Sequence, residues 1–124
     1  MGDVSKNFSR REFACRGEGC CGGAGPVDGR LLAALEVFRA RVGRPVHILS
    51  GFRCLTHNRA IGSADSSQHP KGYAADVAQI EGMSIDEMAS IAAGIEAFRQ
   101  GGIGCYGTFL HLDVREDGAA RWRG

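Results

Sequence analysis

Residues 109–114 read FLHLDV, an alternating stretch that decides how this chain folds. Leucine or valine stands at every second position, while Phe109, His111 and Asp113 occupy the positions between. Successive side chains of a β-strand point to opposite faces of a sheet, so the aliphatic set must face a core. The other face then presents His111 and Asp113 together, followed by Arg115, on rigid backbone. A hydrogen-bonded surface pair gives the same pattern, so this strand alone does not establish a site.

A second polar stretch, SSQHPKGYAAD at residues 66–76, places His69 and Asp76 seven positions apart. Gly72 lets the chain turn between them, and the two alanines before Asp76 leave room beside its carboxylate. With His111 they make a two-histidine, one-carboxylate set, a combination with which catalytic zinc keeps an open position for water. The alternative interpretation is an ordinary turn that leads into a strand.

Hydrophobic periodicity predicts two helices, at residues 27–43 and 84–102, and the second begins at a capping box formed by Ser84 and Glu87. Short apolar runs predict strands at residues 44–52, 76–80, 102–106 and 108–114. The expected fold is α+β, with a small antiparallel or mixed sheet and two main helices on one side. Nineteen glycines indicate that it is rich in loops.

A length of 124 residues suffices for one compact core but not for two. We expect a single domain over residues 1–124, with residues 1–27 forming a cysteine- and glycine-rich arm packed on it. The formal net charge of +1 argues against a nucleic-acid partner. No apolar run approaches the length of about 18 residues that a membrane span requires. The first residues lack the apolar segment of a secretory signal, so we expect synthesis in the cytoplasm. We also expect the protein to be a monomer.

Several motifs occur in an order that resembles a known family. Ser67, His69, Gly72, Ala74 and Asp76 spell SxHxxGxAxD, with SGFR (50–53) and HN (57–58) before them and GGIGCY, FLHLDVR and RW after them. This order resembles the zinc D-alanyl-D-alanine carboxypeptidases, LAS-type metallopeptidases whose relatives include D-Ala-D-Ala dipeptidases, phage L-alanyl-D-glutamate endolysins and the hedgehog signalling domain. The opening NFSRREFAC is most similar to the short phage and prophage members.

The resemblance implies a hedgehog/DD-peptidase-like fold and one catalytic zinc ion bound by His69, Asp76 and His111. It also implies hydrolysis of the peptide stems of bacterial peptidoglycan, in which a metal-bound water attacks the amide carbonyl. The relatives include carboxypeptidases that remove terminal D-Ala and endopeptidases that lyse cells, and both activities remain open. A phage-like member would act on the cell wall after release from the cell or as a virion component.

The resemblance also assigns a role to Arg53, which would polarise the scissile carbonyl and stabilise the oxyanion. Alternatively, Arg53 is structural and pairs with Asp65 or Glu81. The family places its general base three or two residues before the last ligand. Thr108 and Phe109 occupy those positions here, and neither accepts a proton at neutral pH.

Asp113 is the expected substitute base, because it shares the metal-facing side of the strand with His111. The alternative is that Asp113 only orients His111. Ser67, Tyr73 and Phe109 are expected to bind substrate. Ser67 could equally support the turn, and the two aromatic residues could equally belong to the core.

Five cysteines are an odd number, so at least one is outside any disulfide within the chain. Cys15, Cys20, Cys21 and Cys54 could hold a second, structural zinc ion, with His57 close in sequence. A disulfide formed after release and buried thiols are the alternatives. The missing family base also supports a rival to the enzyme: a non-catalytic zinc domain that recognises cell-wall peptide or a protein partner.

Overall fold

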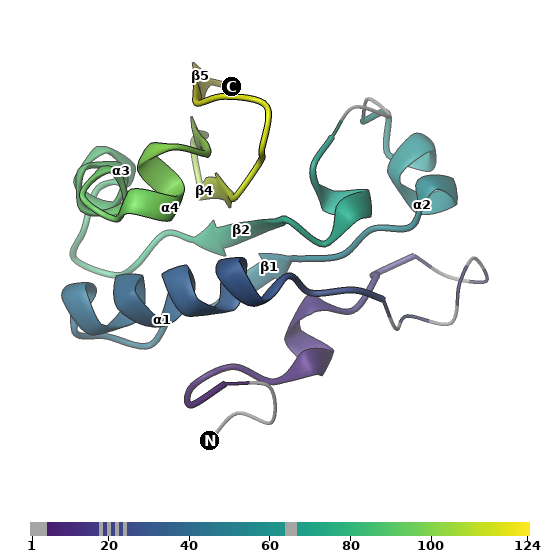
Figure 1. Cartoon of the computed structure of the whole chain (residues 1–124), viewed down its shortest axis with the longest axis horizontal. Coiled ribbons are helices and arrows are strands. Elements are labelled where there is room, and N and C mark those ends of the chain that lie inside the picture. The colour runs from purple at the N-terminus through teal and green to yellow at the C-terminus, as the bar shows by residue number, and fades with distance from the viewer. Residues whose placement is uncertain (1–4, 18, 20, 22, 24, 64–66) are drawn as a thin grey trace.

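The computed structural model describes residues 5–17, 19, 21, 23, 25–63 and 67–124. At its centre is a five-stranded sheet with strand order β1-β2-β4-β3-β5 (Figure 1). The strands are β1 (Ile48–Ser50), β2 (Ala74–Ala78), β3 (Gly102–Cys105), β4 (Phe109–Asp113) and β5 (Ala120–Arg123). Adjacent strands are antiparallel except β3 and β5, which run parallel. The sheet is therefore mixed, and the predicted α+β class is confirmed.

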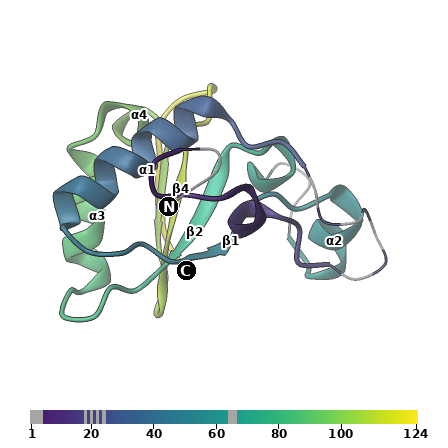
Figure 2. The same ribbon diagram turned by 90° about the horizontal axis from the view of Figure 1, so that it is seen from below.

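Helices α1 (Gly29–Val42), α3 (Ile85–Ala93) and α4 (Glu96–Arg99) cover one face of the sheet, while α2 (Leu55–Ala60) lies on the other side (Figure 2). Leu110 and Leu112 of β4 are fully buried among the helices on the covered face. The alternation of residues 109–114 therefore separates core from site as predicted. Within the described residues, no helix is long and apolar enough to cross a membrane.

The second predicted helix begins where expected but divides into α3 and α4. Ser84 Oγ accepts the backbone N–H of Glu87 and a Glu87 carboxylate oxygen accepts that of Ser84, both at 3.0 Å, which is the predicted capping box. The helix ends at Gly94, whose carbonyl accepts a hydrogen bond from Arg41 at 3.1 Å. Ile95 then adopts extended backbone and is buried. Burial of this apolar side chain, together with the low helix propensity of glycine, explains the interruption.

Four elements lay beyond the prediction: α2, β5 and the short 3-10 helices η1 (Arg10–Phe13) and η2 (His69–Lys71). The three helices have between three and six residues, too few for a hydrophobic period to be visible. Strand β5 reads ARWR, and its side chains are partly or largely exposed, so it carries no buried apolar alternation.

The N-terminal arm joins the same core as the sheet. Phe8 and Phe13 are 0% and 1% exposed. Phe13 also accepts a backbone hydrogen bond from Phe52 at 2.8 Å, just beyond β1. Gly51 makes this approach possible, because a Cβ there would lie 2.6 Å from the Phe13 Cα atom. The arm is thus held against the segment that leaves β1.

Candidate active site

Asp76 and His111 face each other directly across β2 and β4. The His111 Nδ1 atom lies 2.9 Å from Asp76 Oδ1, and the His69 Nε2 atom lies 3.3 Å from the same oxygen. The three potential donor atoms all lie within 4.8 Å of one another. The structure therefore brings together the three residues that the sequence proposed as zinc ligands, from η2, β2 and β4.

His69 is oriented by a backbone carbonyl. Its Nδ1 atom lies 2.6 Å from the Gly51 carbonyl oxygen and donates to it, so the lone pair is on Nε2. Nε2 is buried and has no hydrogen-bond partner among the described residues. A buried polar atom without a partner is costly, and a metal ion would satisfy it. Histidine ligands of zinc are usually fixed through their second nitrogen in this manner, so the site fits the metal.

Gly72 makes the tight turn between the first two ligands possible. It closes η2 with positive φ (74°), and its N–H donates to the His69 carbonyl at 3.0 Å. A Cβ at this position would lie 2.3 Å from the carbonyl oxygen of Pro26. Both the backbone conformation and the space therefore require glycine, and the turn sets the orientation of His69 above β2.

Asp113 lies behind His111 and not beside the open part of the site. Its Oδ2 atom is 2.7 Å from His111 Nε2, and its Oδ1 atom accepts the Gly102 N–H at 2.8 Å. Arg115 donates to both carboxylate oxygens, from Nε at 2.9 Å and from Nη2 at 2.7 Å. Asp113 is fully buried, and its oxygens are taken up by these donors. These contacts favour the alternative, that Asp113 orients His111, over the expectation that Asp113 is the general base.

The carboxylates and His111 shift each other's protonation. Burial alone would raise the pKa of Asp76, but its close contacts with His111 and His69 lower it well below its ordinary value. The pKa of Asp113 is lowered in the same way, with His111 and Arg115 outweighing burial. Burial would lower the pKa of His111, yet Asp113 and Asp76 raise it. The pocket thus keeps both carboxylates ionised, as metal binding at Asp76 requires.

Two glycines of β3 reserve space for the site. Gly102 is the register partner of Asp113, and a Cβ there would lie 2.3 Å from the Asp113 carboxylate. Gly104 stands between His111 on one side and Trp122 on the other. A Cβ at Gly104 would lie 2.4 Å from the indole ring, so its absence lets Trp122 approach His111 to 5.0 Å between ring centroids. The groups that pack against β3 therefore leave room only for glycine at positions 102 and 104.

The sequence pattern of the Peptidase M15 family matches residues 6–113, which include all three ligands. This chain belongs to the peptidase M15 family. No curated protein sequence matches it. As a family member it is a zinc metallopeptidase, and His69, Asp76 and His111 are its candidate metal-binding residues.

The cavity of this M15 peptidase has a volume of about 480 Å³ and opens over the three ligands. Segments from β2, β4, β5 and the α2–η2 connection form its walls. Of the predicted substrate residues, Ser67 and Phe109 line it. Ser67 also supports the turn, since its hydroxyl accepts the His69 N–H at 3.3 Å. The position of Ser67 is therefore compatible with both expected roles, substrate binding and support of the turn.

Arg53 also lines the cavity of the M15 peptidase. Its Nε atom is buried without a hydrogen-bond partner among the described residues. Burial lowers the pKa of Arg53, although the negative charge of Asp76 opposes this. No ion pair joins Arg53 to Glu81 in the described part of the chain, and Asp65 lies outside the described residues. Arg53 thus lies in the cavity that contains the three ligands, and its catalytic role stays a prediction.

Tyr73 is placed differently from its expected role at the cleft wall. Its hydroxyl donates to Glu116 at 3.0 Å, and the cations of Arg30 and Lys71 lie 5.2 and 5.8 Å from its ring. It packs against the core cluster and is not among the described residues that line the cavity. Because Tyr73 and Asp76 are three positions apart, the two-residue period of the strand already placed them on opposite faces.

Five cavity residues were not assigned to the site from the sequence: Ser63, Gln68, Tyr106, Arg115 and Trp122. The Trp122 indole N–H donates to the Tyr106 hydroxyl at 2.8 Å, and the Tyr106 ring stacks on Phe109 with centroids 4.4 Å apart. Together these rings make an aromatic wall beside His111. Arg115 had a local signal, because it continues the alternation of β4. The contact between Trp122 and Tyr106 depends on the parallel pairing of β5 with β3, and no local sequence pattern predicts that pairing.

Proposed function

We propose that this M15 peptidase hydrolyses an amide bond in the peptide stems of bacterial peptidoglycan, with zinc held by His69, Asp76 and His111. One observation carries the proposal: a buried His69 Nε2 atom without a partner, next to a carboxylate and a second imidazole on a cavity floor. When bound, zinc lowers the pKa of a coordinated water to about 7 and polarises a carbonyl.

The residues of the chain supply orientation and charge. Gly51 keeps a proton on His69 Nδ1, and Asp113 keeps a proton on His111 Nε2, so the opposite nitrogen of each ring is directed toward Asp76. Arg115 keeps Asp113 ionised through its paired hydrogen bonds. This chain of contacts fixes the geometry of the ligands before substrate arrives, which reduces the reorganisation needed for reaction.

Arg53 supplies positive charge where the substrate carbonyl would develop negative charge. Its guanidinium lies in the cavity wall and is partly desolvated, a condition that strengthens electrostatic stabilisation. The aromatic wall of Tyr106, Phe109 and Trp122 offers apolar contact for the aliphatic parts of a stem peptide. The proposed cut is at a terminal D-Ala or inside the stem. We also propose that the protein is of phage-like origin.

A second candidate function has its own supporting observation. Among the described residues that line the cavity, Asp76 is the one carboxylate, and it faces both histidines. A hydrolase of this type usually has a separate group that accepts a proton. A zinc domain that binds cell-wall peptide without cleaving it would match this lining as well.

One experiment separates these functions. Zinc-loaded wild-type protein is incubated with purified peptidoglycan, and the soluble fragments are identified by mass spectrometry. Loss of terminal alanine indicates a carboxypeptidase, and cleavage within the stem or a cross-bridge indicates an endopeptidase. Unchanged peptidoglycan together with retention of the protein on the insoluble wall supports the binding domain and contradicts hydrolysis.

Two variants make the result specific to the metal site. His111→Ala removes a ligand and is expected to abolish both zinc binding at this site and cleavage. His47→Ala removes an exposed imidazole that does not line the cavity and is expected to retain both. Cleavage that persists in His111→Ala would assign the activity to a contaminant or another site.

A further inference from the structure

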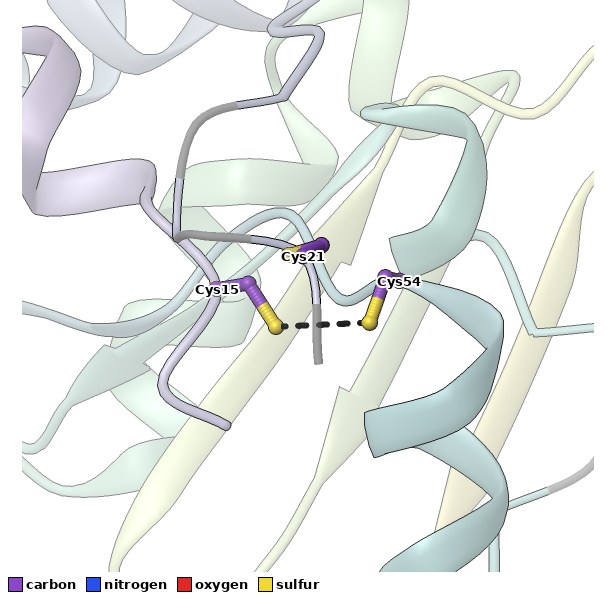
Figure 3. A group of neighbouring side chains, drawn as sticks. All are labelled: Cys15, Cys21 and Cys54. Carbon is purple, nitrogen blue, oxygen red and sulfur yellow. Dashed lines mark hydrogen bonds between the residues drawn. The ribbon is translucent and has the colours of Figure 1, made fainter. Parts of the chain in front are cut away.

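Three cysteines gather at a second point of the molecule, where the N-terminal arm meets α2 (Figure 3). Cys15 and Cys21 come from the arm, and Cys54 is the residue that caps the N-terminus of α2. Their sulfur atoms all lie within 4.8 Å of one another, and Cys15 is buried. Residues from two segments more than thirty positions apart thus converge with their sulfur atoms toward one point.

The spacing of these sulfur atoms fits a shared metal ion. The Sγ atoms of Cys15 and Cys54 are 3.9 Å apart. A disulfide requires about 2.05 Å between its sulfur atoms. Two thiolates bound tetrahedrally to zinc at about 2.3 Å lie about 3.8 Å from each other. The observed distance is therefore that of two corners of a zinc–thiolate tetrahedron, and Cys21 provides a third corner.

The arm needs a constraint of this kind. Five of the ten residues between Cys15 and Pro26 are glycines, and ordering each such residue costs about 1–2 kcal/mol of backbone entropy. The contact that Cys15 makes with Gly23, an N–H donated at 2.7 Å, is the one backbone hydrogen bond within residues 15–25 that the described positions show. Regular secondary structure therefore does not hold this stretch. Binding of a metal ion by several of its side chains would supply the missing free energy.

We propose that Cys15, Cys21 and Cys54 bind a structural zinc ion, distinct from the one at His69, Asp76 and His111, that fastens the arm to α2. Each thiol releases its proton to solvent when it binds. Cys20, which the sequence grouped with these three cysteines, lies outside the described residues. This site does not depend on the proposed hydrolysis.

The test counts zinc in the full-length protein, purified under reducing conditions with zinc present, by elemental mass spectrometry. Two ions per chain are expected in the wild type and one in His111→Ala. One is also expected in Cys54→Ser, and two in the control Cys105→Ser, a cysteine on β3 outside the cluster. A single ion in the wild type that Cys54→Ser retains would overturn the proposal.

A second measurement avoids dependence on the folding of a cysteine variant. A thiol-specific mercurial is titrated into wild-type protein and into His111→Ala, and released zinc is followed with a chromogenic chelator. Release of one equivalent from both proteins is expected, because the thiolates hold the same ion in each. Release of no zinc from His111→Ala, or recovery of a Cys15–Cys54 disulfide from protein alkylated without prior reduction, would overturn the proposal. If the proposed site at His69, Asp76 and His111 bound no zinc, the protein would lack only the ion that the mercurial does not release. That result is distinguishable from failure of the cysteine site.

The ligand type is tested by cobalt substitution. Cobalt bound by three thiolates gives an intense near-ultraviolet charge-transfer band, whereas cobalt at a two-histidine, one-carboxylate site gives none. The band is expected in wild type and in His111→Ala, and its loss from both would contradict thiolate coordination.

Discussion

His111 lies between two carboxylates, with Nδ1 2.9 Å from Asp76 Oδ1 and Nε2 2.7 Å from Asp113 Oδ2. Since ionised carboxylates only accept hydrogen bonds, both ring nitrogens donate in the absence of a metal, which agrees with the raised pKa of His111. A metal ion bound by His111 would replace the proton on Nδ1, while the proton on Nε2 would stay in its hydrogen bond to Asp113. The two carboxylates would then have different roles, Asp76 as a metal ligand and Asp113 as a positioning residue.

Asp113→Asn tests this assignment. The variant loses the charge that faces His111 and Arg115, so we expect zinc affinity at the His/Asp site to fall about 10–100-fold. Affinity is measured by competition with a chelator of known strength. A general base would behave differently: zinc affinity would stay unchanged while kcat fell. Arg115→Lys, which cannot form the paired hydrogen bonds, is expected to weaken zinc binding in the same direction.

Gly104→Ala tests the space that β3 reserves for the indole ring. A Cβ would come within 2.4 Å of Trp122, so we expect the ring to move away from His111 and the protein to lose about 1–3 kcal/mol of stability. Trp122 is the chain's one tryptophan, so its fluorescence reports this movement directly. The matched control is Gly107→Ala, where a Cβ would meet nothing within 4 Å. Identical emission spectra for both variants would contradict the proposed packing.

Arg53→Lys tests the electrostatic role in the cavity. Lysine keeps the charge but cannot reproduce the guanidinium geometry, so we expect kcat to fall about 10²–10³-fold with zinc content unchanged. Activity on peptidoglycan and zinc per chain are measured on the same sample. Arg44→Ala serves as control, because Arg44 bonds to the Glu81 carbonyl away from the cavity. Full activity in Arg53→Lys would assign Arg53 to structure alone.

Glu36→Gln tests how the arm is attached to α1. The Glu36 carboxylate accepts hydrogen bonds at 2.6 Å from the Ser5 hydroxyl and from the backbone and side chain of Asn7. Burial would raise the pKa of Glu36, but these hydrogen bonds lower it overall. A lowered pKa contributes stability that is present above the unfolded value of about 4.3 and is lost as pH falls through the folded value.

The free energy of unfolding of Glu36→Gln is therefore expected to be about 1–3 kcal/mol below wild type at pH 7, with the gap closing under acidic conditions. Urea unfolding at a series of pH values measures the difference. Glu96→Gln, which removes an exposed carboxylate on α4, is the control and should show no such trend. A constant gap across the series would show that the charge of Glu36 does not hold the arm.

The sequence allowed the sheet, the main helices and the metal set to be predicted because each leaves a local pattern. Alternation in residues 109–114 separated Leu112 from His111, and the capping box located the start of α3. The same alternation placed Asp113 on the site face but could not tell whether its carboxylate turns toward the cavity or behind His111. That choice depends on donors from Gly102 and Arg115, which only the assembled sheet brings together.

Trp122 shows why the rest of the site lay beyond prediction. Its strand has no apolar period, and its position follows from parallel pairing with a glycine-rich neighbour. The reason for glycine at position 104, which is space for the Trp122 ring, can be recognised only when β5 is known to lie beside β3. Pairings between distant segments carry little local signal, so the aromatic wall could not be assembled from the sequence.

The segment SGFRC, residues 50–54, runs from the end of β1 to the start of α2 and touches both groups of potential ligands. Its Gly51 carbonyl orients His69, and three positions further along the segment Cys54 presents its sulfur to the arm. In so short a connection, a displacement at Cys54 would be expected to shift the Gly51 carbonyl as well. By thermodynamic reciprocity, if filling the cysteine cluster tightens metal binding at the histidines, filling the histidine site must tighten the cluster by the same factor. Oxidation of the cysteine sulfur atoms would then change the rate of hydrolysis without altering a catalytic residue.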